Sequence, residues 1–309
     1  MARYLVTGGC GFIGSHLVER LLTRGSEVLV LDDMSSGKRE NLPPQVPVTV
    51  GDVADADLVK RCVQGCDGVF HLAAVASVDR SREAWLETHR ANLTGAITVF
   101  DAVKDAGPGG APIPVVYASS AAVYGDNANM PLNEDAATRP LSAYGADKLG
   151  CELHARVADG VFGVPVTGFR FFNVFGPRQD PKSPYSGVIS IFAGKMAKGE
   201  QITINGDGEQ VRDFVYVGDL VRYLIAAMDR PQAGAPVYNV ATGLPTSVNQ
   251  VAQSLAKLLG KNLDVRHGPP RLGDVRVSIG DPTRLEAAFG MRCDTPFEKG
   301  LAATLAWLG

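Results

Sequence analysis

Short apolar runs alternate with longer amphipathic segments along the first 172 residues of the chain. The apolar runs lack polar alternation, which is typical of strands buried on both faces of a sheet. The segments between them carry apolar residues at helical spacing, most clearly at 12–24, 82–104 and 143–162. Strand and helix in steady succession predict an α/β fold with a doubly wound parallel sheet. The predicted strands are residues 3–7, 27–31, 46–50, 68–72, 114–118 and 164–172.

Beyond residue 172 this rhythm changes. The stretch 176–187 is rich in proline, glycine and charge, and helical spacing returns at 188–198 and 248–259. A chain of 309 residues also exceeds the roughly 250–300 at which single cores tend to split. We therefore predict a large lobe and a smaller α/β C-terminal lobe. The large lobe is predicted as 1–172 plus about 215–243, and the smaller one as about 173–214 plus 244–309.

Composition excludes several classes of function. The formal net charge is −3, which argues against a duplex nucleic acid as partner. No apolar run approaches the roughly 20 residues that span a bilayer, and the N-terminal apolar run is too short for a signal peptide. The five cysteines are odd in number and scattered, so we expect neither disulfides nor a metal site. Together these features predict a cytoplasmic protein without a membrane partner.

A glycine-rich turn joins the first predicted strand to the first predicted helix. Gly8, Gly11 and Gly14 form a G-x-x-G-x-x-G pattern. A bound diphosphate needs free N–H groups at a helix N-terminus and close approach to the backbone, which a side chain would block. The strand before the turn and the helix after it are the context in which this pattern indicates a dinucleotide site.

An acidic residue at the end of the second predicted strand supports this interpretation. Asp32 follows Gly14 by 18 residues, where a carboxylate can accept hydrogen bonds from both hydroxyls of an adenosine ribose. The same charge would repel a 2′-phosphate, so NAD is favoured over NADP. Asp33 could share this role, whereas Arg39 could face a 2′-phosphate. The alternative is a plain glycine turn with Asp32 as a surface cap.

A tyrosine and a lysine provide candidate acid–base chemistry. Tyr144 and Lys148 are four residues apart on a predicted helix and share one face. An ammonium group beside a phenol favours the phenolate, which could take a proton from a sugar hydroxyl. The pair alone could be an ordinary exposed helix pair. Ser119 and Ser120 follow the fifth predicted strand, whose end should face the ligand, and Ser120 could orient the hydroxyl and relay its proton.

Five motifs together resemble one known family. They are TGGCGFIG at 7–14, HLAA at 71–74, SSAAVYG at 119–125, YGADK at 144–148 and RFFNVFGPR at 170–178. The chain is similar, nearly end to end, to the extended short-chain dehydrogenase/reductases, and within them to the NAD-dependent UDP-hexose 4-epimerases. The resemblance implies a Rossmann lobe that holds NAD and a smaller lobe that holds a UDP-sugar. It also implies a homodimer formed through segments 82–104 and 143–162. Cys10 departs from the usual alanine, but it is also small.

The resemblance implies roles for further residues. Beside the glycines, Asp32, Tyr144 and Lys148, it places at the cofactor Phe12, Ile13, Asp33, Ser36, Gly37, Asp52, Val53, Leu72, Ala73, Ala74, Asn92, Ser119 and Phe172. Beside Ser120 and Tyr144, it places at the substrate Ser77, Asn173, Val188, Arg212, Arg271, Asp274 and Ser278. Arg212 and Arg271 resemble the two arginines that clamp the diphosphate, and bidentate guanidinium geometry suits that role. Exposed surface arginines are the alternative for both.

The resemblance also narrows the reaction. Family dehydratases carry an acid and a carboxylate just after the Ser/Thr, whereas Ala121 and Ala122 cannot transfer a proton. By the epimerase mechanism, Tyr144 takes the 4-OH proton while C4 gives hydride to NAD⁺. The keto sugar then turns, and hydride returns to its other face.

Two alternatives stay open. One is a UDP-glucuronate 4-epimerase or decarboxylase of the same family. In these enzymes the position of Asn173 is often threonine, and the carboxylate of Asp180 would not help to bind a uronate. The other is a dinucleotide-binding sensor without catalysis, but such chains usually lose the tyrosine or the lysine.

Ser278 resembles the residue that limits the size of the group on C2 of the hexose. A tyrosine there would exclude an N-acetyl group, whereas serine leaves space. We therefore expect UDP-N-acetylglucosamine and UDP-N-acetylgalactosamine to be accepted alongside UDP-glucose and UDP-galactose.

Overall fold

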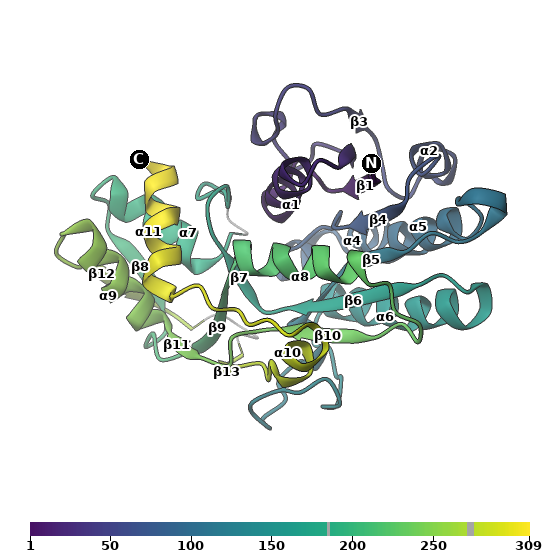
Figure 1. The fold of residues 1–309 in the computed structure, drawn as a ribbon. Helices are drawn as coiled ribbons and strands as arrows, with labels where there is room; N and C mark the ends of the chain where they lie inside the picture. The colour runs from purple at the N-terminus through teal and green to yellow at the C-terminus, as the bar shows by residue number, and fades with distance from the viewer. Residues whose placement is uncertain (184–185, 271–274) are drawn as a thin grey trace. The chain divides into compact units, whose positions relative to one another are not determined.

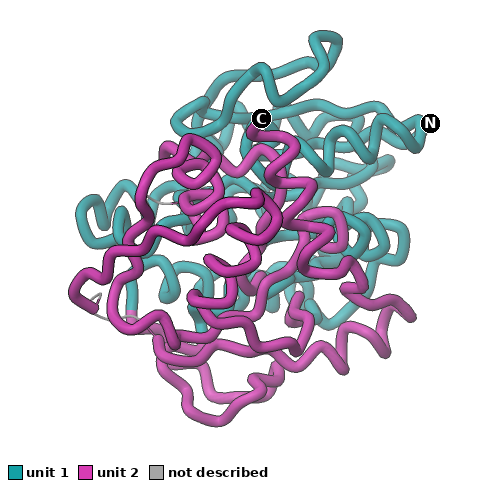
Figure 2. The backbone as a smooth tube through the Cα atoms, turned by 90° about the vertical axis from the view of Figure 1, so that its left-hand side faces the viewer, with its two compact units in different colours: residues 1–123, 142–170, 221–238 teal, residues 124–141, 171–220, 239–309 magenta. Residues whose placement is uncertain are grey.

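The computed structural model describes residues 1–183, 186–270 and 275–309. The chain divides into two compact units that interleave along the sequence (Figure 2). Segment 124–141, which the sequence assigned to the first lobe, belongs to unit 2, where the Leu132 N–H donates to the carbonyl of Ile279. Unit 1 comprises residues 1–123, 142–170 and 221–238, and unit 2 comprises 124–141, 171–220 and 239–309.

A mostly parallel seven-stranded sheet forms the centre of unit 1, in the order β10-β6-β5-β4-β1-β2-β3 (Figure 1). This order confirms the predicted doubly wound α/β fold. Observed boundaries differ from the predicted ones by at most two residues, and β5 extends far enough to include Ser120. The strands are β1 Arg3–Thr7, β2 Glu27–Asp32, β3 Val48–Val50, β4 Gly68–His71, β5 Val115–Ser120, β6 Val166–Phe171 and β10 Val237–Val240.

The register of the strands gathers their carboxyl ends at one edge. Thr7, the last residue of β1, pairs with Leu31 in β2 and with His71 in β4. His71 in turn pairs with Tyr117 in β5. The residues that follow these strands therefore lie at the edge where ligands bind in doubly wound folds.

Helices cover both faces of this sheet. On one face α2, α5 and α6 pack side by side, and the core beneath them includes Leu5, Val69 and Val115 (Figure 1). On the other face the ring of Tyr4 meets the edge of Phe70 at a centroid distance of 5.5 Å. The helices are α1 Phe12–Thr23, α2 Ala56–Cys62, α3 Val78–Glu83, α4 Trp85–His89, α5 Gly95–Val103, α6 Ala143–Phe162 and α8 Val217–Asp229, of which α8 begins in unit 2.

The helix predicted over 82–104 is interrupted once, at Ala84, and the chain is helical from Trp85 to Val103. The structure divides this stretch among the end of α3, α4, a π-helical segment Arg90–Thr94 and α5. Ala84 has φ −133° and ψ 63°, which interrupts the helical path between α3 and α4. The π-helical segment contains the fully buried Asn92. Wider turns of this kind are frequently found at functional sites.

Unit 2 has its own small sheet and core. Strand β9 pairs with β7, β11 and β13, and β8 pairs with β12. The core is formed largely by side chains of α7, α9 and α11, including Phe192, Leu255 and Leu301. The strands are β7 Asn173–Phe175, β8 Ile202–Asn205, β9 Val211–Tyr216, β11 Pro245–Ser247, β12 Val265–Gly268 and β13 Val277–Ser278. The helices are α7 Val188–Ala197, α9 Val248–Leu259, α10 Thr283–Phe289 and α11 Phe297–Leu308.

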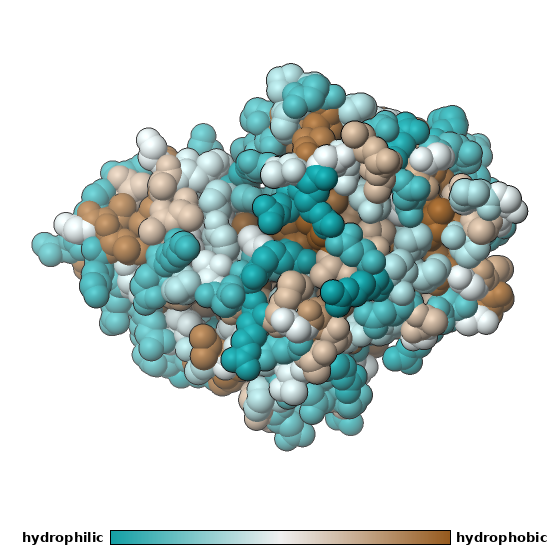
Figure 3. Space-filling model, viewed as in Figure 1, coloured by the Kyte–Doolittle hydropathy of each residue, from teal (hydrophilic) through white to brown (hydrophobic). Residues whose placement is uncertain are grey.

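Hydrophilic and hydrophobic residues are mixed on the face drawn in Figure 3, where the hydrophobic ones form separate patches. Within the described part of the chain, no helix has both the length and the apolar character needed to cross a membrane.

Candidate active site

The glycine turn after β1 is shaped by two different constraints. Gly8 has φ +69°, and a Cβ there would lie 2.7 Å from the backbone nitrogen of Ala73. A Cβ on Gly14 would lie 2.2 Å from the carbonyl oxygen of Gly8. At Gly11 a Cβ would meet only that same oxygen, at 3.2 Å, and would otherwise fill open space. The backbone of the turn itself therefore requires glycine at positions 8 and 14. Gly11 instead leaves the space next to the turn empty.

The first turn of α1 offers an anion unpaired N–H groups. No side chain caps this helix at Gly11, and no acidic residue lies in its first turn. The N-terminal N–H groups of a helix have no partners within the helix, and its dipole favours negative charge. Phe12 and Ile13 occupy this first turn. The turn therefore fits a diphosphate, as the sequence predicts.

Asp32 ends β2 at the same edge. Its Oδ2 accepts a hydrogen bond from the Cys10 N–H at 2.9 Å, and its Oδ1 accepts one from the Met34 N–H at 2.9 Å. Burial raises the pKa of this carboxyl, and the two N–H groups oppose the rise. A Cβ on Gly37 would lie 2.7 Å from Oδ1, so Gly37 leaves the carboxylate room. Asp33 and Ser36 are exposed, and the Asp33 carboxylate accepts hydrogen bonds from Ser35.

A short network fixes the segment that follows β4. The carbonyl of Thr7 accepts from the Leu72 N–H at 3.1 Å, and its Oγ1 accepts from the Ala73 N–H at 3.2 Å. The same Oγ1 lies 2.8 Å from Nδ1 of His71, so the Thr7 hydroxyl can donate to this ring nitrogen. Burial, with the charge of Lys148, lowers the pKa of His71 to about 3, which keeps the imidazole neutral. His71 therefore links β4 to the Thr7 side chain of β1.

Asn92 holds the next part of this segment. Its Oδ1 accepts from the Val75 N–H at 2.8 Å, and its Nδ2 donates to the Val75 carbonyl at 3.3 Å. The side chain therefore acts on the protein's own backbone, one residue beyond Ala74. Asp52, which the resemblance also places at the cofactor, accepts from Nε of Arg90 at 2.9 Å, and the next residue, Val53, is buried. Ser77 caps α3 by accepting from the Arg80 N–H.

The predicted catalytic residues lie on β5 and α6. Lys148 is 3% exposed, and its Nζ donates to the Ala118 carbonyl of β5 at 2.9 Å. The same Nζ lies 5.9 Å from the ring centroid of Tyr144, one helical turn earlier. Ser120 ends β5, and its Oγ accepts from the Ala122 N–H at 3.1 Å, which leaves its hydroxyl proton free to donate. Lys148 thus connects the helix of Tyr144 to the strand of Ser120.

Two buried charged residues beside this group, Glu152 and Arg170, are not predicted from the sequence. Glu152 lies four residues after Lys148 on α6, and its Oε1 accepts from Oγ of Ser119 at 2.6 Å. Both carboxylate oxygens accept from Arg170, which ends the unit 1 part of β6. The sequence does carry one signal, which is a glutamate on the apolar face of a predicted helix. Such a residue is seldom buried without a partner, so it implies that a partner exists. Its partners are 33 and 18 residues away along the chain, and no local pattern identifies them.

In unit 2, three predicted substrate residues lie on adjacent strands. Ser278 in β13 pairs in register with Arg212 in β9, and Asn173 in β7 pairs with Phe214 two residues further along β9. The fully buried Asp213 stabilises this region by accepting from the backbone N–H groups of Thr242 and Gly243 at 2.8 Å. Strand β9 thus brings Asn173, Arg212 and Ser278 onto one small sheet.

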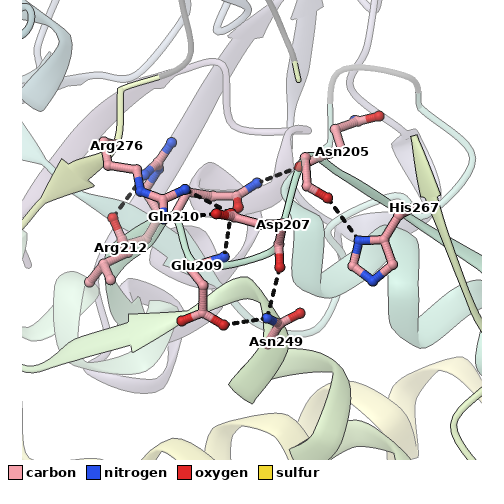
Figure 4. Close-up of polar contacts among 10 residues, drawn as sticks. Asn205, Asp207, Glu209, Gln210, Arg212, Asn249, His267 and Arg276 are labelled. Carbon is pink, nitrogen blue, oxygen red and sulfur yellow. Dashed lines mark hydrogen bonds and ion pairs between the residues drawn. The ribbon is translucent and has the colours of Figure 1, made fainter. Parts of the chain in front are cut away.

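A turn next to these strands is held by an exposed ion pair (Figure 4). Nη1 and Nη2 of Arg276 donate to Oδ1 and Oδ2 of Asp207 at 2.7 and 2.9 Å. These hydrogen bonds lower the pKa of Asp207 to about 2. Nδ2 of Asn249, at the start of α9, donates to the Asp207 carbonyl and to Glu209. The pair therefore ties the turn after β8 to the residues just before Ser278.

The remaining predicted substrate and cofactor residues lie partly within the described chain and partly outside it. Val188 is the first residue of α7, and Phe172 is buried against the ring of Tyr124. Arg271 and Asp274 lie outside the described residues. Among those that are described, no group of three or more His, Cys, Asp or Glu is placed to hold a metal ion.

Comparison with known proteins tests the resemblance. A family model described as the NAD dependent epimerase/dehydratase family matches residues 4–241. The chain is also 36% identical over 310 residues to the UDP-glucose 4-epimerase of Mycolicibacterium smegmatis, a match that covers 98% of this chain and 97% of that protein. The chain belongs to the NAD-dependent epimerase/dehydratase family. NAD is thus its cofactor, in agreement with the turn at Gly11 and the carboxylate of Asp32.

Solved structures agree with this assignment to the NAD-dependent epimerase/dehydratases. One is the UDP-glucose 4-epimerase of Thermotoga maritima with UDP-glucose, with a TM-score of 0.94, 36% identity and coverage of 99% of this chain and 98% of that one. Another is the UDP-N-acetylglucosamine 4-epimerase of Methanobrevibacter ruminantium in complex with UDP-N-acetylmuramic acid, with a TM-score of 0.91, 36% identity and coverage of 99% and 97%. The fold and the family predicted from the sequence are confirmed.

Proposed function

We propose that this enzyme interconverts UDP-hexoses that differ in configuration at C4. The observation that carries the proposal is the link between Lys148 and the Ala118 carbonyl, which fixes the helix of Tyr144 against the strand that ends in Ser120. The similarity to UDP-sugar 4-epimerases over nearly the whole chain supports it.

Three residues of unit 1 divide the chemistry among them. Tyr144 would take the proton of the sugar 4-OH as general base and return it as general acid. The ammonium of Lys148 would stabilise the phenolate by its charge. Ser120, whose Oγ already accepts from the Ala122 N–H, would donate toward the sugar oxygen and orient it. When bound, NAD supplies the acceptor and donor of hydride.

The two residues after Ser120 favour epimerisation over dehydration. Ala121 and Ala122 begin a short 3-10 helix and carry no group that could move a proton. Loss of water from a hexose needs an acid to protonate the departing hydroxyl and a base to remove the proton from the neighbouring carbon. Epimerisation at C4 needs only the group that acts on the 4-OH.

The decisive experiment is incubation of the purified enzyme with a panel of UDP-sugars without added NAD. We expect UDP-glucose and UDP-galactose to interconvert, because hydride returns within one turnover and the cofactor need not leave. Chromatography identifies the products. Tyr144→Phe should lower kcat by about 10²–10⁴-fold, the usual effect of general acid–base catalysis. Turnover of UDP-glucuronate alone would instead identify a uronate enzyme, and unchanged activity of Tyr144→Phe would contradict the chemistry.

We further propose that the N-acetylated pair is accepted. Ser278 lies in register beside Arg212, so its small side chain borders the strand expected to bind the diphosphate. Ser278→Tyr should abolish turnover of UDP-N-acetylglucosamine and spare UDP-galactose. Ser278→Ala is the matched control and should turn over both pairs. If the unaltered enzyme converts UDP-galactose well but not the N-acetylated pair, this part of the proposal is wrong.

A further inference from the structure

A buried ion pair connects α6 to two strands of unit 1. Glu152 is 2% exposed and Arg170 is 4% exposed. Nε of Arg170 donates to Oε1 of Glu152 at 2.9 Å, and its Nη2 donates to Oε2 at 2.7 Å. Oγ of the buried Ser119 donates to Oε1 at 2.6 Å. Buried ion pairs often add little stability compared with apolar residues, so their presence invites a role beyond stability.

The position of the pair points to that role. Glu152 follows Lys148 by one turn of α6, and Ser119 immediately precedes Ser120 in β5. Lys148 bonds to Ala118 and Glu152 bonds to Ser119, so consecutive turns of the helix are attached to consecutive residues of the strand. The helix that carries Tyr144 cannot slide or rotate along β5 without breaking both links.

The charges around the pair matter as well. Tyr117 of β5, Cys151 of α6 and His71 of β4 are uncharged near neutral pH. Burial raises the pKa of Tyr117 well above its usual value and that of Cys151 to about 11, and it lowers the pKa of His71 to about 3. The charge of Arg156 opposes the rise in the pKa of Tyr117. Asp147, a further carboxylate of α6, has its Oδ1 2.8 Å from Nδ1 of His89.

The carboxylate of Glu152 lies one helical turn from Lys148 on α6. Without Arg170 its negative charge would oppose the effect of the Lys148 ammonium on Tyr144. With Arg170 the two charges of the pair offset each other, so Glu152 adds little to the field that Lys148 and the buried Asp147 produce at Tyr144. The guanidinium thus holds the carboxylate in place and also compensates its charge.

We infer that Glu152, paired with Arg170, is a positioning residue for the reaction proposed above. It fixes α6 on β5 through Ser119, and Arg170 shields Lys148 and Tyr144 from its charge. The pair contacts neither substrate nor cofactor in this role, which rests on the proposed 4-epimerase function.

The test compares the pH dependence of kcat among charge variants. Glu152→Gln leaves the Arg170 charge unbalanced, which favours the phenolate, so the midpoint of the acid limb should move down by about one pH unit. Arg170→Met leaves the Glu152 charge unbalanced, so the midpoint should move up by a similar amount. A shift of one pH unit is the effect expected from one charge at the position of Glu152, about 12 Å along the helix from Tyr144, at an effective dielectric constant of about 20. The double variant should return to the midpoint of the unaltered enzyme.

Two further variants separate position from stability. Arg170→Lys keeps the charge but loses the bidentate geometry, so kcat should fall about tenfold with an unchanged midpoint and a KM within about twofold. This variant keeps the test decisive if Arg170→Met does not fold. Val166→Ala creates a cavity in the same core without changing any charge. It should lower the melting temperature and leave the midpoint of the acid limb of kcat unchanged.

The inference is overturned if Glu152→Gln and Arg170→Met move the midpoint in the same direction or leave it unmoved. A failure of the proposed function looks different, because no UDP-hexose is then converted by the unaltered enzyme. In that case the ionisation of Tyr144 can be followed by phenolate absorbance near 295 nm, with each variant compared against the same variant carrying Tyr144→Phe. Opposite shifts still support the inference, and their absence overturns it.

Discussion

Single glycines show how one residue type can meet different needs within seven residues. A diphosphate site explains Gly8, Gly11 and Gly14 equally well from the sequence alone. The structure separates them, because a Cβ on Gly8 or Gly14 would collide with the protein's own backbone. Only at Gly11 does the space beside the glycine face open room. The three positions should therefore differ when they are substituted.

We expect Gly14→Ala and Gly11→Ala to have separate effects. The Cβ at position 14 would lie 2.2 Å from the carbonyl of Gly8, so we expect a loss of about 1–3 kcal/mol in the free energy of unfolding. Gly11→Ala should leave the melting temperature of the NAD-free protein nearly unchanged and weaken NAD binding at least tenfold. Thermal unfolding and calorimetric titration with NAD measure the two effects. Equal stability losses in both variants would contradict the distinction.

At the scale of elements, the links between strand ends and helices determine the geometry of the site. Local patterns predict α6 well, because Ser142 caps its start and Gly163, with φ 67°, ends it. Helix α9 is predicted equally well, since its start and end are also marked by local signals. The pairing of Asn92 with Val75 is different, because the two residues are 17 positions apart and Asn92 lies in a π-helical segment. Periodicity reports which face of an element is buried but not which distant group it meets.

The link between β1 and β4 predicts a pH dependence of stability. Burial lowers the pKa of His71 to about 3, whereas an unfolded histidine titrates near 6.5. Between these two pH values the unfolded chain binds one more proton than the folded protein. The contribution of His71 to the free energy of unfolding is therefore complete above about pH 6.5 and is lost as the pH falls. One such group changes the free energy of unfolding by about 1.4 kcal/mol per pH unit.

The His71→Asn variant should therefore show a shallower loss of stability in acid. Its free energy of unfolding should fall less steeply between pH 6 and pH 5, by about 1.4 kcal/mol. Urea titrations at these two pH values measure the slopes. A titration at pH 8 is the control, because it isolates the packing change at a pH where the imidazole is neutral in both states. Parallel slopes for the two proteins would exclude a protonation effect of His71.

At the scale of the whole molecule, exposed apolar residues on two contacting helices of unit 1, α4 and α6, predict self-association. On α6, Leu153, Val157 and Val161 follow one another at four-residue spacing and are each about half exposed or more. On α4, Trp85 and Leu86 are 67% and 85% exposed. Exposed apolar residues gathered on one face indicate an interaction site. We expect these helices to pair with their copies in a homodimer, as the sequence resemblance implies.

Light scattering coupled to size exclusion should accordingly give a mass of twice 32.6 kDa. Val157→Asp should reduce it to that of a single chain, because two carboxylates would be buried across a symmetric interface. Leu258→Asp is the matched control, since this exposed residue lies on α9 in unit 2, and it should leave the dimer intact. A single-chain mass for the unaltered protein would contradict the homodimer.

The interleaving of the two units affects synthesis on the ribosome. Strand β10 at Val237–Val240 completes the sheet beside β6, and the Gly168 N–H donates to the Pro236 carbonyl next to it. At roughly 5–20 residues per second, β6 waits several seconds for this neighbour while residues 172–236 emerge in between. During that interval its edge is open to pairing with other nascent chains. A chaperone that binds the growing polypeptide at this stage would protect the yield of folded enzyme more than one that acts after release.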